Sequence, residues 1–168
     1  MHVMEAIKER RSIRRFQDRP VEEKTLGQLL EAVRLAPSAR NRQEWRFVVI
    51  KDLDQIRRVA AATGQPFVGT APVVIAGVAL NPERVMGCGV PTYAVDLTIA
   101  MTHLVLAATA FGLGACWIGA FDQEEVKRIL RIPPACKVVA LMPLGYPAEQ
   151  PEARPRKPLA EIVSYDSF

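Results

Sequence analysis

The sequence predicts one domain of mixed α/β structure, residues 1–168, in which helices cover a sheet. Helical and strand-like hydrophobic patterns alternate along the chain, and only four segments have the apolar character of strands. No strand is followed by a GxGxxG turn and a helix: Gly112 and Gly114 follow a helix and precede a strand, the reverse of a dinucleotide-binding fold. A hydrophobic content of 49% is enough for a core. These observations favour a layered domain without a Rossmann or Walker motif.

The first half of the chain contains three predicted helices and one strand. A short helix at Val3–Glu9 has an apolar stripe and leads into a run of arginines. Leucines at helical spacing predict a helix over Val21–Leu35, which the next proline ends. The polar segment Pro37–Glu44 is expected to be a loop, and Phe47–Ile50 a buried strand. An aspartate then caps a helix over residues 52–62.

The longest predicted helix, Thr92–Phe111, follows an interior strand at Pro72–Leu80 and a loop at Asn81–Pro91. Its apolar side chains go almost all the way round, while Asp96 and His103 make a membrane span a poor interpretation. We interpret Asp96 as a residue that caps or pairs within the dimer core, and His103 as a core or interface histidine with one hydrogen bond. A soluble helix of this kind must be covered on most sides, and a second subunit is a suitable cover for so short a chain. We therefore expect a homodimer and no membrane association.

Two strands, a helix and an irregular arm complete the predicted elements. Ala115–Gly119 and Lys137–Gly145 read as strands, and Asp122 begins the helix between them, with Glu125 at the third position as in a capping box. The segment Pro147–Pro158 is proline-rich and is not expected to form a regular element. We expect the arm, residues 147–168, to reach over a partner subunit.

Charge and cysteine content exclude several classes of protein. The net charge is +4 and the pI about 9.2, a mild basic excess whose arginines concentrate before Phe47. That distribution suits a localised anion site better than a nucleic-acid track. Three cysteines without CxxC spacing indicate neither a disulfide framework nor a zinc site, and no metal is predicted. The N-terminus lacks an apolar signal segment, so a cytoplasmic setting is expected.

The strongest candidate for a ligand site is the segment RRSIRRF at residues 10–16, with four arginines and one hydroxyl. Arginine side chains bind phosphate bidentately, and a serine hydroxyl can complete such a site. In an extended segment Ser12 and Arg14 share one face, while Arg11, Ile13 and Arg15 share the other. One face can then bind an anion while Ile13 and Phe16 anchor the segment. The local pattern is equally compatible with a solvent-exposed basic run.

Four parts of the sequence can be read together: RRSIRRF, PSARNRQEWRFVVI, GLGACWIGAFDQEEVKRILRIP followed by VVALMPLGYP, and the tail EARPRKPLAEIV. In this order and spacing they resemble the FMN-dependent nitroreductase family, over nearly the whole chain. The resemblance implies an α+β fold of three layers, with a mainly antiparallel central sheet flanked by helices, in an intertwined homodimer. It also implies that two FMN molecules bind at the dimer interface.

The resemblance also implies the residues that hold the phosphate and the pyrimidine edge of the flavin. Arg10 and Ser12 resemble ligands of the phosphate. Arg14 is similar to the basic residue near the pyrimidine edge. Arg154 and Arg156 resemble the basic pair in the tail that closes over the phosphate.

Further cofactor-binding residues implied by the resemblance lie in three other segments. The loop residues that resemble contacts from the other subunit are Pro37, Ser38, Ala39 and Asn41. The residues that align with the strand end beside the isoalloxazine are Trp117, Ile118, Gly119 and Ala120, and the backbone N–H of Gly119 is expected to point at N5. Arg11 and Gln65 complete the set, although the alternation places Arg11 on the opposite face of the arginine stretch.

The function implied is that of an FMN-dependent oxidoreductase. NADH or NADPH gives a hydride to flavin N5, and a quinone, nitroaromatic or similar flat acceptor then takes two electrons. No catalytic residue is predicted, because the cofactor supplies the chemistry. Two alternatives stay open: a non-catalytic flavin-binding or flavin-sensing dimer, and a specialised member such as a flavin reductase or dehalogenase. Glu44 stands where many relatives have proline, and Asn81–Pro91 is short, which favours an open site with broad acceptor choice.

Overall fold

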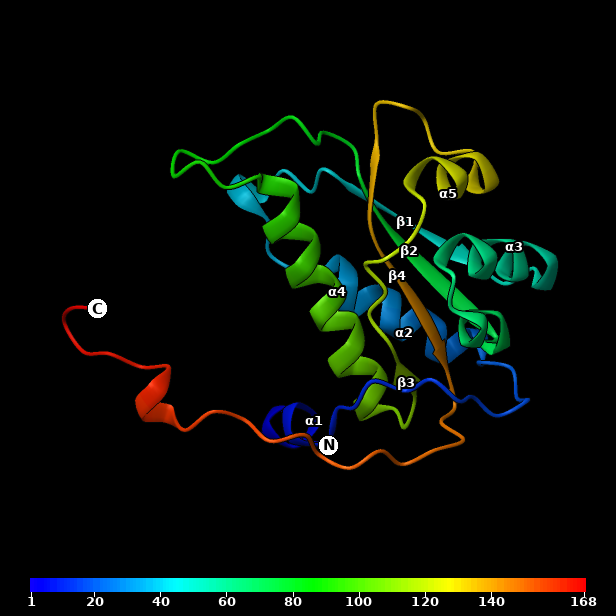
Figure 1. Ribbon diagram of the computed structural model, residues 1–168, viewed down its shortest axis with the longest axis horizontal. Helices are drawn as coiled ribbons and strands as arrows, with labels where there is room; N and C mark the ends of the chain where they lie inside the picture. Colours follow the sequence, from blue (N-terminus) through cyan, green and yellow to red (C-terminus); the bar gives the residue numbers. More distant parts are fainter.

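A four-stranded antiparallel sheet is the centre of the protein, whose computed structural model describes the whole chain, residues 1–168 (Figure 1). The strands are β1 (Trp45–Ile50), β2 (Val73–Ala79), β3 (Gly114–Ala115) and β4 (Lys137–Gly145), in the spatial order β1-β2-β4-β3. Every residue of β2 is buried, because the strand lies inside the sheet and is covered on both faces. This is why its sequence is a continuous apolar run rather than an alternation.

Helices form a layer on each face of this sheet. The helices α2 (Glu23–Arg34) and α4 (Thr92–Ala110) cover one face, and α3 (Leu53–Thr63) and α5 (Gln123–Leu130) cover the other. The alternation along β2 places Ile75 in the core under α2 and α4, and Val74 in the core under α3 and α5. The short helix α1 (Val3–Glu9) lies against α4. The predicted α+β fold, with three layers and an antiparallel sheet, is confirmed.

Side-chain caps explain where two of the helices begin. Asp52 accepts a hydrogen bond from the N–H of Gln55 at the start of α3, and that helix ends at Gly64, whose φ of +64° favours glycine. Asp122 accepts from the N–H of Glu125 in the same way at the start of α5. The predicted capping box at α5 is only half formed, because the Glu125 carboxylate pairs with Arg128 instead of the Asp122 N–H.

The predicted strand Ala115–Gly119 is wrong in its extent. Regular pairing with β4 stops at Ala115, and Ile118 makes only an isolated bridge to Leu141. The cause lies in the opposite strand: the N–H of Cys116 donates to the carbonyl of Pro143 at 3.3 Å, but proline has no N–H to return. The ladder is therefore interrupted after β3 and resumes only at the bridge between Ile118 and Leu141, and Trp117 between them is exposed.

Helix α4 is buried on one side only. Leu97, Met101 and Leu104 face the core and are at most 1% exposed, whereas Thr98 and Thr102 on the other side are exposed. By length and composition α4 could cross a membrane, but its packing is that of a core helix. This chain alone does not supply the cover that the sequence predicts for most sides of α4.

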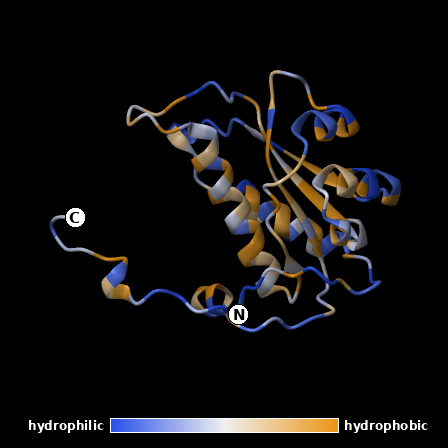
Figure 2. Cartoon of the chain, viewed as in Figure 1, coloured by the Kyte–Doolittle hydropathy of each residue, from blue (hydrophilic) through white to orange (hydrophobic).

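The two ends of the chain expose further apolar side chains. Figure 2 shows hydrophobic residues in α1 and in the short turn near the C-terminus. The apolar stripe predicted for α1 does not face this chain's own core, since Val3, Met4 and Ile7 are exposed and only Ala6 is buried. Figure 1 shows the C-terminal arm passing α1 and running away from the sheet. As predicted, residues 147–158 form no regular element, and a single 3-10 turn follows at Leu159–Glu161.

Candidate functional site

The arginine stretch, residues 10–16, lies beside β3 and is fixed there by Ile13. Ser12 forms an isolated parallel bridge with Ala115, and the N–H of Ile13 donates to the Ala115 carbonyl at 3.0 Å. Ile13 is buried, and a Cβ added at Gly114 would lie 2.7 Å from the Ile13 Cβ. The backbone of β3 and the Ile13 side chain thus approach closely, while Arg14 stays exposed. The predicted role of Ile13 as the anchor of the stretch is confirmed.

The C-terminal arm runs next to the arginine stretch from the opposite end of the chain. Gln17 donates its N–H to the Tyr146 carbonyl at 2.8 Å, and Ala148 donates to the Arg15 carbonyl at 2.8 Å. The carboxylate of Glu149 accepts from the N–H of Arg14 at 2.5 Å and of Arg15 at 3.2 Å. These contacts place the part of the arm that carries two more arginines across from the stretch.

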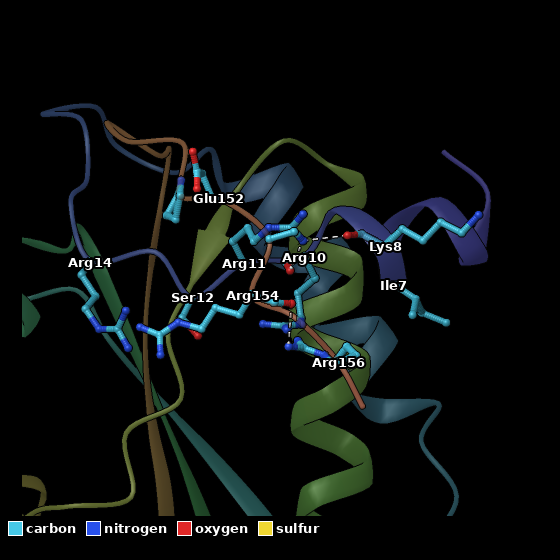
Figure 3. A pocket seen from close by; sticks show the side chains of 11 residues that line it. Ile7, Lys8, Arg10, Arg11, Ser12, Arg14, Glu152, Arg154 and Arg156 are labelled. Atoms are coloured by element: carbon cyan, nitrogen blue, oxygen red, sulfur yellow. Dashed lines mark hydrogen bonds between the residues drawn. The ribbon is translucent and has the colours of Figure 1, made fainter. Parts of the chain in front are cut away.

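Between the stretch and the arm lies a cavity of about 580 Å³ (Figure 3). Its lining, called here the cationic cavity, consists of Ile7, Lys8, Arg10, Arg11, Ser12, Arg14, Pro151, Glu152, Ala153, Arg154 and Arg156. Six of these side chains are cations and one is a carboxylate. None of the six takes part in any of the seven ion pairs of the protein. The cavity thus has an excess of positive charge that the protein does not compensate.

Figure 3 shows how these cations are distributed. Arg14 and Arg154 extend toward Ser12, and Arg10, Arg11 and Arg156 gather on the side of Lys8. Two unpaired guanidinium groups and a hydroxyl on one side, with more cations on the other, fit an anion of the size and charge of a phosphate monoester.

Two cations differ from the predicted arrangement or have other contacts. Arg11 was expected on the opposite face, yet it lines the cavity, because its guanidinium turns back to donate to the carbonyls of Lys8 at 2.7 Å and Arg10 at 2.9 Å. Arg14 also lies over the ring of Phe67, with its Cζ 6.0 Å from the ring centroid. This contact connects the cationic cavity to the segment that follows Gln65.

Cys116 lies at the border of the site but is not suited to act as a nucleophile. Burial raises the pKa of the Cys116 thiol, against the opposing influence of Arg14 and of a hydrogen bond with Ser12. The thiol therefore stays protonated near neutral pH and behaves as the small hydrophobic group that its sequence context predicts.

The polar loop Pro37–Glu44 does not line the cationic cavity of the same chain. Its conformation is tightly fixed: Ser38 accepts from the N–H of Gln43 at 3.0 Å, and the buried Asp96 on α4 accepts from the N–H of Ala39 at 3.0 Å. Asn41 has a φ of +53°. Asp96 thus accepts a backbone N–H of the loop, as expected of a capping residue, and holds the loop in place.

The remaining predicted residues do not line the cationic cavity. Gln65 lines a second, shallower cavity of about 440 Å³ at the end of α3. Ile118 is buried, whereas Trp117, Gly119 and Ala120 are exposed between β3 and α5. The structure thus brings together six of the predicted residues round one cavity: Arg10, Arg11, Ser12, Arg14, Arg154 and Arg156.

Sequence reasoning missed Lys8, Glu149 and Glu152 at this site. Lys8 could have been found, because it lies in the last turn of α1, only two residues before the stretch. Glu149 gave no local signal, since its contacts are to residues 134 and 135 positions away. No group of three or more His, Cys, Asp or Glu side chains that could hold a metal ion is present.

Comparisons with known proteins give the following similarities. A model of the nitroreductase family matches residues 7–67 and 61–146. An NADH dehydrogenase of Thermus thermophilus is 35% identical over 186 positions, covering 92% of this chain and 91% of that protein. An FMN reductase of Bacillus subtilis that uses NAD(P)H is 31% identical over 184 positions, covering 99% of this chain and 74% of that protein. The crystal structure of a nitroreductase family protein from Clostridium novyi NT has a TM-score of 0.84 and 35% identity, covering 92% of this chain and 89% of that one.

Proposed function

The chain belongs to the nitroreductase family, and we propose that it is an FMN-dependent NAD(P)H oxidoreductase that reduces a quinone, a nitroaromatic compound or a similar flat acceptor. The observation that carries the proposal is the cationic cavity, whose six cations have no carboxylate partner. The relative from Bacillus subtilis, an FMN reductase that uses NAD(P)H, supports the choice of both cofactor and reductant.

FMN fits this cavity because its phosphate is a dianion at neutral pH. Arg10, Ser12, Arg154 and Arg156 would bind the phosphate, since all four line one cavity and none of the arginines is committed to an ion pair. Arg14, at the end of the cavity near Phe67, would lie at the pyrimidine edge. Its charge would stabilise the negative charge that a reduced flavin gains near N1 and O2, and so raise the reduction potential.

The exposed residues after β3 are suited to border the ring. The backbone N–H of Gly119 would donate to N5, beside Trp117, Ile118 and Ala120, and Gln65 would approach the pyrimidine ring across the site. FMN supplies hydride and two-electron transfer chemistry when bound. The protein would bind and orient the ring and its reaction partners, and no side chain is assigned as a general acid or base.

A homodimer would complete the site. Pro37, Ser38, Ala39 and Asn41 lie away from the cavity of their own chain, which suits a contact with the flavin held by a second copy. The uncovered side of α4, the exposed stripe of α1 and the apolar residues Leu159, Ile162 and Val163 of the arm would all be covered in such an assembly. These surfaces support the proposal that the arm reaches over the partner.

The first test is retention of FMN. Purified protein reconstituted with FMN should keep a yellow chromophore through desalting, and the double variant Arg10→Ala/Arg156→Ala should lose it. The control Arg15→Ala/Arg46→Ala removes the same charge from exposed positions outside the cavity and should retain FMN. Equal retention by both double variants would contradict the phosphate assignment.

A second measurement separates the enzyme from a non-catalytic flavin-binding dimer. Stopped-flow mixing of the reconstituted protein with NADH or NADPH should bleach the flavin absorbance rapidly, and a quinone or nitroaromatic acceptor should restore it. Absence of bleaching at millimolar nicotinamide would favour the flavin-binding protein instead. Comparison of free FMN, quinones and nitroaromatic compounds as acceptors would then distinguish a flavin reductase from the broader oxidoreductase.

A further inference from the structure

Glu149 joins the two parts of the chain that form the cationic cavity. One oxygen, Oε1, accepts the main-chain N–H groups of both Arg14 and Arg15, at 2.5 and 3.2 Å. The next residue back, Ala148, donates its own N–H to the Arg15 carbonyl at 2.8 Å. The side chain of Glu149 is the only one in the arm that hydrogen-bonds to the backbone of the arginine stretch.

The contact is unusual because the carboxylate stands beside a cluster of unpaired arginines without forming an ion pair. None of the seven ion pairs includes Glu149. Its charge is directed instead at two backbone donors, and charge-assisted bonds of this kind are about twice as strong as neutral ones. The contact therefore serves to fix the backbone rather than to neutralise a side chain.

The shape of the arginine stretch depends on this acceptor. In an extended strand, successive N–H groups point to opposite sides, so a single oxygen can accept both only where the chain bends. The shared acceptor therefore implies a departure from regular extended geometry at Arg14 and Arg15. Arg14 lines the cavity beside Phe67, and Arg15 does not. Extended geometry alone already places adjacent side chains on opposite faces; Glu149 fixes the backbone at Arg14 and Arg15 and so holds Arg14 at the cavity.

The same contact limits where the arm can lie. Arg154 follows Glu149 by five residues, a length that spans at most about 17 Å of extended chain. Because Glu149 is held at the stretch, Arg154 and Arg156 stay within reach of Ser12 before any anion binds. A preformed site loses less conformational freedom on binding than one assembled by the ligand.

We propose that Glu149 is a positioning residue, which holds Arg14 and the arm in the arrangement that binds the anion. The inference rests on the proposed function for the identity of that anion, the FMN phosphate. The charge of Glu149 alone would weaken binding, because a carboxylate repels a bound phosphate. Its hydrogen-bonding role and its charge therefore predict opposite effects when it is replaced.

Two substitutions separate these effects. Glu149→Gln keeps an oxygen acceptor and removes the charge, so FMN affinity should stay within about twofold of the original protein. Glu149→Ala removes the acceptor as well and should raise the Kd for FMN about tenfold, the magnitude expected for loss of strong hydrogen bonds and preorganisation. The control Glu152→Ala removes a carboxylate from the same cavity with no backbone contact, and should bind FMN at least as tightly as the original.

A double-substitution cycle and the reduction potential test whether the effect passes through Arg14. In the Arg14→Ala background, Glu149→Ala should have a smaller effect on FMN affinity than in the original protein. The flavin bound to Glu149→Ala should also have a lower reduction potential, because Arg14 is no longer held at the pyrimidine edge. Full additivity together with an unchanged potential would overturn the positioning role, as would equal weakening by Gln and Ala.

A measurement on the unsubstituted apoprotein keeps the inference testable if Glu149→Ala fails to fold. The backbone amides of Arg14 and Arg15 should be protected from hydrogen exchange, and exchange at the rate of an exposed loop would overturn the proposal. Binding of the anion can also be tested without flavin: inorganic phosphate should stabilise the apoprotein, and it should stabilise Glu149→Ala less. A protein that binds phosphate in this way but never FMN would contradict the proposed function and leave the role of Glu149 intact.

Discussion

The cations of the helices and the cations of the cavity differ in how their charge is compensated. Arg34, Arg57 and Arg128 each pair with a carboxylate three residues earlier on the same helix, at 2.5 to 2.9 Å. In the cationic cavity, by contrast, six cations from two ends of the chain share one carboxylate and form no ion pair. Helical pairs form from local sequence alone, whereas the cavity requires the fold to bring like charges together.

The difference shows where folding stability is lowered in favour of ligand binding. Like charges held close in the folded state repel one another, and an anion removes that repulsion. A residue in the cavity should therefore affect ligand binding more than folding, and a residue in a helical pair should affect neither strongly. Four predictions test this contrast, beginning with the contact between Ile13 and Gly114 that holds the arginine stretch against β3.

The largest effect is expected from Gly114→Ala. A Cβ at this position would lie 2.7 Å from the Ile13 Cβ, so either the arginine stretch or β3 must move. Overpacking of this kind costs about 1–3 kcal/mol of unfolding free energy. Because Ser12 and Arg14 flank Ile13, FMN affinity should fall as well. Denaturant unfolding and FMN titration measure the two effects.

Gly27→Ala is the matched control for that substitution. Gly27 lies inside α2, and nothing stands within 4 Å of an added Cβ. The same change should there stabilise the protein by about 0.5–1 kcal/mol, since alanine favours a helix over glycine. Destabilisation by Gly27→Ala, or none by Gly114→Ala, would contradict the account of Ile13 as the anchor.

These two glycines also show what the sequence could and could not predict. Hydrophobic periodicity indicates which face of an element is apolar, and it correctly predicted the positions of the helices, the interior strands and Ile13 as an anchor, although the apolar stripe of α1 is exposed in this chain. It cannot report a partner far along the chain. The early end of β3 depends on Pro143, and the place of Arg11 depends on carbonyls that its side chain turns back to reach.

Local sequence patterns predicted the composition of the candidate site, whereas its assembly with the arm was implied only by the resemblance to a family. Four arginines in seven residues indicate an anion site from local sequence. That the arm lies beside them depends on contacts such as that between Arg14 and Glu149, 135 residues apart. The buried link from Asp96 to the N–H of Ala39, 57 residues away, is of the same kind. Such contacts are set by tertiary packing, which no short pattern encodes.

The second prediction concerns the unpaired charge itself. Inorganic phosphate should raise the thermal midpoint of the apoprotein, by an amount equivalent to about 1.4 kcal/mol at ten times its Kd. Arg154→Gln should reduce that stabilisation, because one of the six cavity cations is lost. Without phosphate, at low ionic strength, the same variant should be slightly more stable than the original, since repulsion in the cavity is relieved. A variant less stable in both conditions would contradict the contrast.

The third prediction uses an ion pair between two loops rather than within a helix. Glu44 binds Arg84 at 2.6 and 3.0 Å and joins the polar loop to residues 81–91. The hydrogen bond from Arg84 lowers the pKa of Glu44 below its ordinary value of 4.5, despite some opposing desolvation. The folded protein therefore holds this proton less tightly than the unfolded chain, so the stabilisation is complete above the ordinary value and is lost as pH falls through the folded pKa.

Thermal unfolding of the original protein and of Glu44→Gln from neutral to acid pH measures that contribution. The original should be more stable above the ordinary pKa, and the difference should shrink as the solution becomes more acid. Because both side chains are partly exposed, the effect should be smaller than that of Gly114→Ala. A difference that grows toward acid pH would reverse the assigned direction of the shift.

The smallest effect is expected from Arg128→Gln on α5. The hydrogen bond from Arg128 lowers the pKa of Glu125, yet the two side chains are 64% and 38% exposed, and solvent screens such a pair. The variant should therefore show no measurable change in thermal midpoint, and phosphate should stabilise it as much as it stabilises the original. It removes the same charge as Arg154→Gln, but from a position where the Glu125 carboxylate already compensates that charge. If Arg128→Gln weakened the response to phosphate as strongly as Arg154→Gln, net charge rather than the cavity would be the cause.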